Sequence, residues 1–426
     1  MHFSSKIVFF LYKFLTLILA PVGVAFLCYK KRLDPPYGKR VFELLGFYPY
    51  KLKNCIWFHA ASVGEINSLK PLILKFQKVN PNKTILITTM TTTGGIAASN
   101  IPNVHTFFMP LDSPCVIKRF FNNFKPKFLF IVDTELWPNM LQGALKNKCK
   151  VIIVNGRMQE KNCQKYLKFK NLVKDIIATP LYKVICISKE DAQRFERIGI
   201  DTNKIKVAGN IKYDLNLNFE PFHKGRKIKA TFNGMVLCCA STHDGEESIC
   251  LEVFKALKTK IPSLKLVAVP RHKTGVDLFE KKLSNQNLSY IKKSQIKNSL
   301  EYQNNEIILG DTMGEMSFYF GLSDLVFMGG SFVPIGGHNP LEPAYFSMPT
   351  ITGPDYHNFK DQFKMLITQE GAFEVQNQSE FITKSLELLS SPDKIKLSGE
   401  HALEILNLGR GSTDKILKEI AEDLSA

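Results

Sequence analysis

The sequence predicts an α/β protein in which two doubly wound parallel sheets follow one another along the chain. Short runs that are apolar throughout alternate with stretches whose apolar residues recur at helical spacing, and strands buried on both faces are typical of parallel sheets covered by helices. This alternation stops over residues 215–234, which are polar and contain proline and glycine, and then starts again. A third observation, a nearly charge-free run over residues 7–29, adds an N-terminal membrane-anchor helix to the expected architecture.

The composition agrees with a protein of this class. A chain of 426 residues, 45% of them hydrophobic, has room for about two domains with sizeable cores. The formal net charge of +17 favours anionic partners such as phosphates and membrane lipids. We predict no nucleic-acid partner, because the basic residues are dispersed and no motif that reads nucleic acid is present. The nine scattered cysteines contain no C-x-x-C pair, which argues against a disulfide framework or a zinc site and favours a reducing compartment.

The N-terminal apolar run is long enough to span a bilayer, although Lys13 and Pro21 interrupt it. The cluster KKR at residues 30–32 follows directly, and such clusters mark the cytoplasmic side of membrane segments. We therefore expect residues 1–32 to form a single anchor that spans the bilayer or lies in its interface, with the remaining chain at the cytoplasmic face. The alternatives are a cleaved signal peptide, for which no A-x-A-like site precedes Lys30, and an apolar helix docked on the protein itself.

After the anchor we expect a Rossmann-like domain (residues 33–214), a linker (215–234) and a second Rossmann-like domain (235–426). The end of the chain, from about residue 393, reads as helices that stay with the second domain or pack back on the first. The strands are expected at residues 55–60, 84–90, 128–133, 151–156, 183–188 and 205–210 of the first domain, and at 235–241, 264–270, 306–312, 324–330 and 349–354 of the second.

Three of the predicted strands end in a residue that can cap a helix, with a glutamate three positions later, which is the capping-box spacing. The carboxyl ends of parallel strands meet at one edge of a sheet, where ligands of doubly wound folds bind, so these glutamates can serve capping and function together. Pro71 lies inside the helix that the first of these caps would begin, so that either this helix bends or a short turn ends near Lys70 and a new helix begins. The pairs are Ser62–Glu65, Thr312–Glu315 and Asn339–Glu342.

The stretch GGSFVPIGGHNPLEPA at residues 329–344 is the most specific of these. Its two Gly-Gly pairs allow a close approach of the backbone, and Asn339 is expected to cap a helix whose first residue is Pro340. A glycine-rich loop that leads into a helix N-terminus offers free amides to an anion, and the carboxylate of Glu342, one turn later, suits two vicinal sugar hydroxyls. Together with His338, this pattern favours a phosphate-and-ribose site over a simple turn, although no P-loop motif is present.

Other residues after predicted strands are weaker candidates. In LGDTMGEM (309–316), Thr312 is expected to cap a helix with Gly314 inside its first turn, which indicates either close backbone approach or an ordinary turn. Arg271 can clamp a phosphate and Lys212 can pair with a leaving phosphate. Taken alone, each of these two cations is better explained as a solvated surface side chain.

Asp133 and Glu135 form a D-x-E pattern at the end of a predicted strand, which can in principle bind a divalent metal. Trp137 and Pro138 follow directly and predict a rigid turn instead, and no second carboxylate cluster accompanies the pair. The histidines are dispersed without metal-ligand spacing. We therefore predict no metal site and no bound cofactor.

These segments together resemble the bacterial Kdo transferases, which are 3-deoxy-D-manno-octulosonic acid transferases of lipopolysaccharide assembly. The similarity covers essentially the whole chain and includes, in family order, HAASVGE, TELWPN, GNIKYD, PRH, GDTMGEM and GGHNPLEPA. The sequence departs from the family at NGRMQEKN (155–162), where a more basic, serine-containing stretch is usual.

The resemblance implies a GT-B architecture, in which two Rossmann-like domains face a cleft, the first binding mainly the acceptor and the second the nucleotide. It implies CMP-Kdo as donor and the lipid A precursor (lipid IVA) as acceptor, with membrane lipids as further partners and no protein partner. Glu65 resembles the family's general base, and Glu135 and Lys212 resemble residues that stabilise the transition state. The CMP-binding residues that it implies are Pro270, Arg271, Met313, Gly314, Glu315, Asn339, Pro340, Leu341 and Glu342.

Two other classes of function remain open at this level. A different GT-B sugar transferase or a sugar-nucleotide epimerase would use the same double-domain fold, although an epimerase would act on a soluble sugar nucleotide and would not need a membrane anchor. A non-catalytic membrane protein that binds nucleotide sugar or lipid would keep its function when Glu65 is replaced by alanine.

Overall fold

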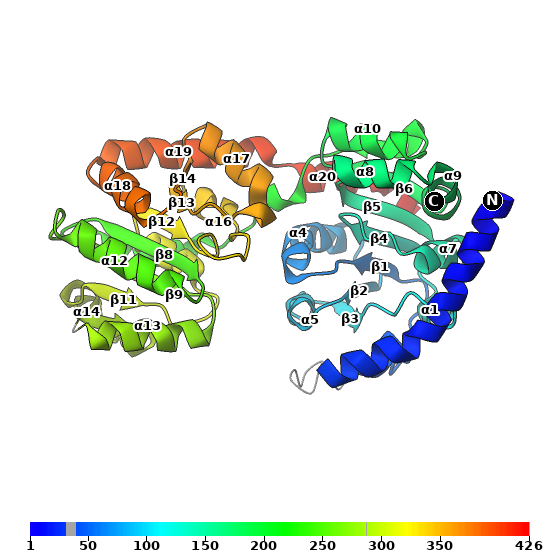
Figure 1. Cartoon of the computed structure of the whole chain (residues 1–426), viewed down its shortest axis with the longest axis horizontal. Coiled ribbons are helices and arrows are strands. Elements are labelled where there is room, and N and C mark those ends of the chain that lie inside the picture. The colour runs from blue at the N-terminus through cyan, green and yellow to red at the C-terminus, as the bar shows by residue number, and fades with distance from the viewer. Residues whose placement is uncertain (31–39, 287, 426) are drawn as a thin grey trace. The chain divides into compact units, whose positions relative to one another are not determined.

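The computed structural model describes residues 1–30, 40–286 and 288–425, and the chain divides into two compact units (Figure 1). Unit 1 consists of Met1–Asp214 and Arg410–Ala426, and unit 2 of Leu215–Gly409. Each unit contains a seven-stranded sheet in which every described strand pairing is parallel. The predicted class of two doubly wound α/β domains is confirmed. Residues 31 and 32 of the predicted basic cluster lie outside the described residues.

The sheet of unit 1 has the strand order β3-β2-β1-β4-β5-β6-β7. The chain runs outward from β1 to β3 and then returns to the other side of β1 with β4, and ligands of doubly wound sheets bind at this reversal. The strands are β1 (Ile56–His59), β2 (Ile85–Thr89), β3 (Val104–Phe108), β4 (Phe128–Val132), β5 (Lys150–Gly156), β6 (Leu181–Cys186) and β7 (Ile205–Val207).

Helices cover both faces of this sheet, and short helical turns complete the connections. The helices are α1 (Phe3–Lys30), α3 (Val41–Leu44), α4 (Val63–Val79), α5 (Thr92–Ser99), α6 (Pro114–Phe124), α7 (Pro138–Lys146), α8 (Glu160–Leu167), α9 (Lys170–Val173), α10 (Lys189–Arg197) and α20 (Ser412–Ser425). The turns are η2 (Lys174–Ala178), η3 (Thr202–Lys204) and η4 (Ile211–Tyr213).

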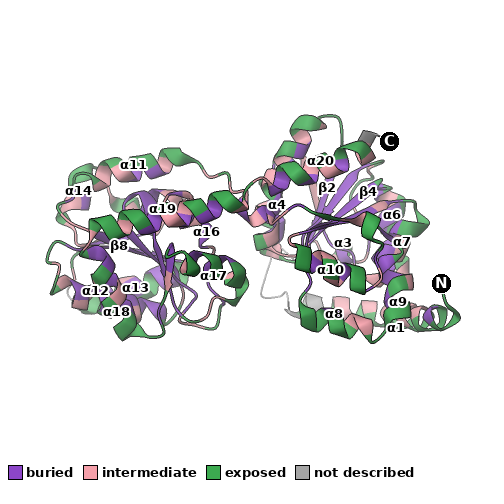
Figure 2. Cartoon of the chain, turned by 90° about the horizontal axis from the view of Figure 1, so that it is seen from above, coloured by how far each residue is buried: buried purple, intermediate pink, exposed green. Residues whose placement is uncertain are grey.

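The strands are buried on both faces, as Figure 2 shows for both units. Trp57 and Phe58 are neighbours on β1, so their side chains point to opposite faces of the sheet, and both are fully buried. The ring of Trp57 lies 4.2 Å from that of Phe120 on α6, and the ring of Phe58 lies 4.8 Å from that of Phe130 on β4. Polar side chains that could act on a ligand are therefore confined to the strand ends.

Helix α4 runs without interruption through Pro71. The alternative of two helices separated near Lys70 is wrong. Pro71 removes the hydrogen bond to the carbonyl of Asn67, and Asn67 is exposed, so water can satisfy that carbonyl. Ser62 caps the helix, and its hydroxyl accepts the amide of Glu65 at 3.4 Å.

The sheet of unit 2 has the order β10-β11-β9-β8-β12-β13-β14 and reverses between β8 and β12. Its strands are β8 (Val236–Thr242), β9 (Lys265–Pro270), β10 (Tyr290–Lys292), β11 (Ile307–Leu309), β12 (Leu325–Met328), β13 (Thr350–Thr352) and β14 (Ala372–Glu374). Its helices are α11 (Phe219–Lys229), α12 (Glu246–Lys258), α13 (Lys273–Asn285), α14 (Ser299–Asn304), α15 (Met316–Gly321), α16 (Leu341–Tyr345), α17 (Lys360–Thr368), α18 (Gln378–Leu389) and α19 (Pro392–Gly409), with the turns η5 (Lys293–Gln295) and η6 (His357–Phe359).

The predicted linker over residues 215–234 is corrected by the structure, because α11 is an integral helix of unit 2. Helix α11 packs closely on α15 through two glycines. A Cβ added to Gly225 would meet the Cα of Gly321 at 2.9 Å, and one added to Gly321 would meet the carbonyl of Phe222. Packing of one backbone on another does not require a row of apolar side chains, so residues 215–234 have the composition of a polar linker.

Helix α20 belongs to unit 1, although the rest of the C-terminal segment belongs to unit 2. Ile416 and Ile420 are fully buried in the core that α4 also lines. Asp214 accepts the amide of Gly411 at 2.7 Å, so the chain leaves unit 1 and re-enters it at one point. The last helix thereby completes the core of the domain in which the chain began.

Helix α1 lies along unit 1 and is docked by one side only (Figure 1). The hydroxyl of Tyr12 donates to Asp112 at 2.8 Å, and the amide of Asn139 donates to the hydroxyl of Thr16 at 3.2 Å. The other side exposes its apolar residues, among them Phe10 and Leu11. Within the described chain, Phe3–Phe26 is long and apolar enough to cross a membrane, with a mean hydropathy of 2.2.

We expect the Ile420→Ala substitution to destabilise unit 1 by about 2–5 kcal/mol, because it empties a fully buried site between α20 and α4. Both tryptophans of the chain, Trp57 and Trp137, lie in unit 1, so tryptophan fluorescence during urea unfolding reports on that unit alone. Lys418→Ala on the exposed side of the same helix is the matched control and should leave the midpoint unchanged. An unchanged midpoint for Ile420→Ala would show that α20 is not part of the core.

Candidate functional site

Glu65 lies in the first turn of α4, directly after β1 at the strand-order reversal of unit 1. Its carboxylate accepts the amide of Ala61 at 2.7 Å and the hydroxyl of Ser62 at 3.0 Å. The predicted capping box is therefore formed, although the carboxylate reaches the amide before the cap residue and not that of the cap residue itself. Burial and the nearby charges of Asp133 and Glu135 raise the pKa of Glu65 to about 7, against these two hydrogen bonds.

Asp133 and Glu135 follow β4, the strand on the other side of the reversal. Asp133 adopts a left-handed conformation (φ 57°) and accepts the amide of Asn155 at 2.7 Å. Glu135 is half-buried and accepts the indole N–H of Trp137 at 3.0 Å. Since both charges act on the pKa of Glu65, the three carboxylates form one cluster on the two sides of the reversal.

Lys212 lies on the turn η4, which packs against α4, the helix that carries Glu65. Asn155, at the end of β5, accepts the amide of Ile211 at 3.0 Å, while its own amide donates to Asp133. Asn210 accepts the backbone amide of Lys212 at 2.9 Å. These bonds join the ends of β4 and β5 to the turn after β7, so the predicted catalytic residues of unit 1 share one edge of the sheet.

The predicted nucleotide-binding residues lie at the carboxyl edge of the sheet of unit 2, on the segments after β9, β11 and β12. Pro270 ends β9, and Arg271 follows it with an exposed side chain. Burial raises the pKa of Glu342, whereas its hydrogen bond with Asn339 and the charge of Arg271 act against this rise. Arg271 and the Asn339–Glu342 segment therefore lie near one another, although about seventy residues separate them in the sequence.

The predicted Asn339 cap is wrong, because the helix begins one residue later and Pro340 is its N-cap residue. The side chain of Asn339 accepts the amide of Leu341 at 3.1 Å, and α16 begins at Leu341 and not at Pro340. The Asn339 amide also lies 3.5 Å from Glu342. One amide of the helix start is therefore satisfied, while the glutamate stays oriented by its neighbour.

The predicted Thr312 cap is wrong. Helix α15 begins at Met316 with Glu315 before it, and the hydroxyl of Thr312 is hydrogen-bonded to the buried hydroxyl of Tyr319 at 2.5 Å. Gly314 is not inside the helix but in an exposed turn, where its φ of +79° requires glycine. Met313 beside it is 78% exposed, so this turn presents backbone and an apolar side chain at the carboxyl edge of the sheet.

Two features of unit 2 that shape its strand-end edge were not predicted from the sequence: the segment after β8 and Glu246, the first residue of α12. Glu246 is fully buried and its carboxylate accepts four backbone amides, from His243, Gly330, Ser331 and Phe332, at 2.7–3.0 Å. The segment after β8 is thereby fixed to the glycine-rich loop after β12. The sequence does show two glutamates, Glu246 and Glu247, at the start of a helical pattern. Only the strand order, however, shows that α12 lies beside the glycine-rich loop after β12.

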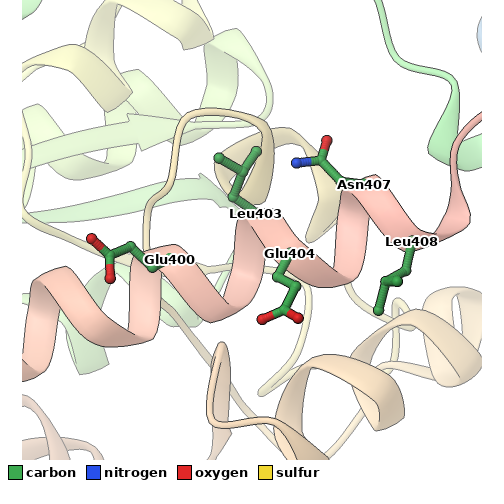
Figure 3. Close-up of a pocket in the computed structure, with 5 residues that line it drawn as sticks. All are labelled: Glu400, Leu403, Glu404, Asn407 and Leu408. Carbon is green, nitrogen blue, oxygen red and sulfur yellow. The ribbon is translucent and has the colours of Figure 1, made fainter.

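The hollow on α19 does not offer another site. Within the described residues, no group of three or more His, Cys, Asp or Glu side chains could hold a metal ion. A shallow hollow of about 390 Å³ lies on α19 (Figure 3). All five residues that line it belong to one helix, so no groups from other elements converge there. They are Glu400, Leu403, Glu404, Asn407 and Leu408.

Two Rossmann-like units with polar residues gathered at their strand-order reversals define the GT-B class of fold. The chain is similar to the solved structure of a glycosyltransferase from Rickettsia africae (TM-score 0.56, 17% identity, covering 88% of this chain and 99% of that one). It is also similar to a UDP-GlcNAc 2-epimerase from Neisseria meningitidis (TM-score 0.51, 14% identity, covering 87% and 100%). These identities establish the fold alone, because transferases and epimerases share it.

The amino-acid sequence separates these two activities. Residues 39–215 match the family of 3-deoxy-D-manno-octulosonic-acid transferases (kdotransferases). The chain is 34% identical over 421 residues to the 3-deoxy-D-manno-octulosonic acid transferase of Haemophilus influenzae, covering 96% of this chain and 97% of that protein. The chain belongs to the Kdo transferases and is a glycosyltransferase of lipopolysaccharide biosynthesis.

We expect the Asp133→Asn substitution to lower the pKa of Glu65, because it removes a negative charge that raises this pKa. Asparagine tolerates the left-handed backbone at this position and can still accept the amide of Asn155. A titration of labelled Glu65 carboxyl groups by nuclear magnetic resonance measures the shift. Asp201→Asn, which removes an exposed charge elsewhere in unit 1, should leave the titration unchanged. An equal titration in Asp133→Asn and the unsubstituted protein would contradict the carboxylate cluster.

Proposed function

We propose that the protein transfers Kdo from CMP-Kdo to the lipid A precursor, lipid IVA, with inversion at the sugar and release of CMP. The observation that carries this proposal is the carboxyl of Glu65, which lies at the strand-order reversal of unit 1 with a pKa of about 7. The identity over nearly the whole length of a Kdo transferase supports the choice of sugar. The sugar-nucleotide epimerase is the less favoured alternative, because the fold alone supports it.

Glu65 is the proposed general base. A carboxyl with a pKa near neutrality is partly ionised at physiological pH and is basic enough to take a proton from an acceptor hydroxyl as that hydroxyl attacks the sugar. Ser62 and the amide of Ala61 hold the carboxylate in one orientation. An inverting transfer needs one such base on the side opposite the leaving group, and no covalent intermediate.

The leaving phosphate is proposed to be stabilised by fixed positive groups without a metal ion. Arg271 and the amides at the start of α16, all in unit 2, supply positive charge or hydrogen-bond donors, and Lys212 in unit 1 is proposed to stabilise the transition state. Glu135 is proposed to stabilise the positive charge that develops on the sugar. The nucleotide is proposed to bind along Pro270–Arg271, Met313–Glu315 and Asn339–Glu342.

We expect Glu65→Gln to reduce Kdo transfer about 10²–10⁴-fold, the usual contribution of a general base. Purified protein is incubated with CMP-Kdo and lipid IVA, and the mass gain of the lipid and free CMP are measured. The rate of the unsubstituted protein should rise with pH through about 7, because the raised pKa leaves Glu65 protonated and inactive below it. This limb of the pH profile should be absent in Glu65→Gln.

The exposed residue Glu196 on α10 provides the matched control, and Glu196→Gln should transfer Kdo at the unsubstituted rate. Failure of the unsubstituted protein to modify the lipid would overturn the proposed reaction. Full activity of Glu65→Gln would overturn only the assignment of the base. Loss of activity with a chelator would contradict transfer without a metal, and the number of mass increments gives the number of Kdo residues added.

We propose that α1 holds the protein at the cytoplasmic face of the inner membrane and lies in the interface without spanning the bilayer. Tyr12 and Thr16 fix one side of the helix to unit 1, and His2 is hydrogen-bonded to Asp175 of η2 at 2.8 Å. A helix that crossed the bilayer would have to give up these contacts. The opposite, apolar side would then enter the lipid, which is where an acylated acceptor lies.

We expect Leu11→Lys to lower the membrane-bound fraction of the protein several-fold, because Leu11 is 58% exposed on the proposed lipid side of α1. Leu300→Lys on α14 is the matched control, since Leu300 is 61% exposed in unit 2 and should not affect binding. Sedimentation with vesicles of anionic lipid measures the fraction. An N-terminal epitope tag tests the orientation: cleavage of this tag by protease added to intact spheroplasts would show a spanning helix and overturn the interfacial one.

A further inference from the structure

Two histidines of unit 2 form a direct hydrogen-bonded pair at the carboxyl edge of the sheet. The Nε2 atoms of His243 and His338 lie 2.8 Å apart, and the two rings are nearly parallel with centroids 5.1 Å apart. His243 follows β8, whereas His338 ends the glycine-rich loop after β12. Strand order explains the meeting, because β8 and β12 are neighbours in the sheet.

The short distance restricts the protonation states that the pair can adopt. A hydrogen bond between two Nε2 atoms needs a proton on one and a lone pair on the other. If both rings are neutral, they are opposite tautomers, so that one Nδ1 carries a proton and the other does not. None of the described residues hydrogen-bonds to Nδ1 of either ring, and neither atom is among the buried unpaired ones. The pair therefore presents one accessible N–H donor whose orientation is set by the partner ring.

The surrounding backbone holds the two rings in place. Glu246 binds the amides of both His243 and Gly330, which joins the two loops. Gly330 has a φ of +71°, and a Cβ at this position would lie within 3.2 Å of the ring of His338. The ring thus packs directly on the backbone of the loop, and a larger residue at 330 would displace it.

Burial is the main cause that favours the neutral forms of both rings. The groups whose charges act on the pair are Glu246 of α12 and Arg271 and His272 after β9. Burial and then the charge of Arg271 lower the pKa of His338 to about 3, and burial also lowers the pKa of His243. Of the two rings, His338 lies on the loop that leads directly into the Asn339–Glu342 segment predicted to bind the nucleotide.

We propose that His338 donates an N–H hydrogen bond to an anionic oxygen of the donor nucleotide sugar, and that His243 is the positioning residue that orients it. This inference rests on the proposed binding of CMP-Kdo by unit 2. The anionic oxygen belongs either to the phosphate or to the sugar carboxylate, which share the same chemistry. His338 and Arg271 then bind one anion from the segments after β12 and β9, the strands on the two sides of β8.

Two glutamine variants separate the roles of the two rings. Glutamine can replace the Nε2 side of a histidine but has no group at Nδ1. His338→Gln keeps the hydrogen bond between positions 338 and 243 but loses the proposed N–H donor at Nδ1 of His338. His243→Gln keeps the same hydrogen bond and leaves that donor in place. We expect His338→Gln to weaken CMP binding about 10- to 100-fold, the range for a lost hydrogen bond to a charged group, and His243→Gln to change it less than about 3-fold.

The ligands identify the anionic oxygen. Calorimetry measures the affinity of the protein for CMP and for cytidine, and the transfer assay gives the KM for CMP-Kdo. If the variant binds CMP more weakly but binds cytidine as before, the hydrogen bond is assigned to the phosphate. Unchanged CMP binding with a KM for CMP-Kdo that rises about 10-fold or more assigns it to the carboxylate, by the same hydrogen-bond range. His223→Gln on the exposed side of α11 is the control and should behave as the unsubstituted protein.

Three results would overturn the inference. One is that His338→Gln leaves both CMP binding and the KM for CMP-Kdo unchanged. Another is that it weakens cytidine as much as CMP, which would indicate a role in packing alone. The third is that His243→Gln is the more damaging variant. Failure of the unsubstituted protein to bind CMP would instead overturn the proposed nucleotide site, so the two failures are distinguishable.

Discussion

In both units, a glutamate in the first turn of the helix after the first strand bonds back to the backbone that precedes it, and the site of each unit depends on this interaction. In unit 2, Glu246 accepts four amides and is fully buried, so its whole bonding capacity is used to join two loops. In unit 1, Glu65 accepts one amide and one hydroxyl and remains half-buried. The same position is thus structural in one unit and left open to chemistry in the other.

The sequence was sufficient for the elements whose signal is local. Buried central strands such as β1 and β4 are apolar throughout, and the Ser62–Glu65 cap follows from spacing alone. The strands that the prediction omitted, β3, β10 and β14, all lie at sheet edges, where shorter or half-exposed strands lose the continuous apolar pattern. The helix over residues 219–229 was not predicted, because α11 packs through Gly225 and Gly321 and not through a row of apolar side chains. The Thr312 cap was predicted wrongly, because the hydroxyl of Thr312 is hydrogen-bonded to Tyr319. The pairing of His243 with His338 needs the strand order, which no local pattern contains.

Helix α1 shows that docking on the protein and the proposed contact with a membrane are compatible, because they use different sides of the helix. Its docked side carries Ser5, Phe9, Tyr12 and Thr16 at helical spacing, while the remaining sides are almost wholly apolar and exposed. Asp112, which binds Tyr12, also accepts the amides of Asn139 and Met140 and so caps α7. A carboxylate that already organises the fold therefore holds the helix, and the apolar sides remain free for lipid. The few polar residues in a hydrophobic run thus specify which side of the helix faces the protein.

The charge distribution around the proposed leaving group has a consequence for turnover. A phosphodiester donor carries one negative charge at its phosphate, and the departing nucleotide monophosphate gains a second. Groups that favour the second charge lower the barrier, but a site that held the product dianion with several fixed cations would release it slowly. Arg271 is one exposed cation, and burial lowers the pKa values of His243 and His338, which favours their neutral forms. In the proposed nucleotide site of unit 2, one cation and neutral donors stabilise the developing charge through oriented hydrogen bonds, an arrangement that we propose favours the transition state while limiting the attraction for the product.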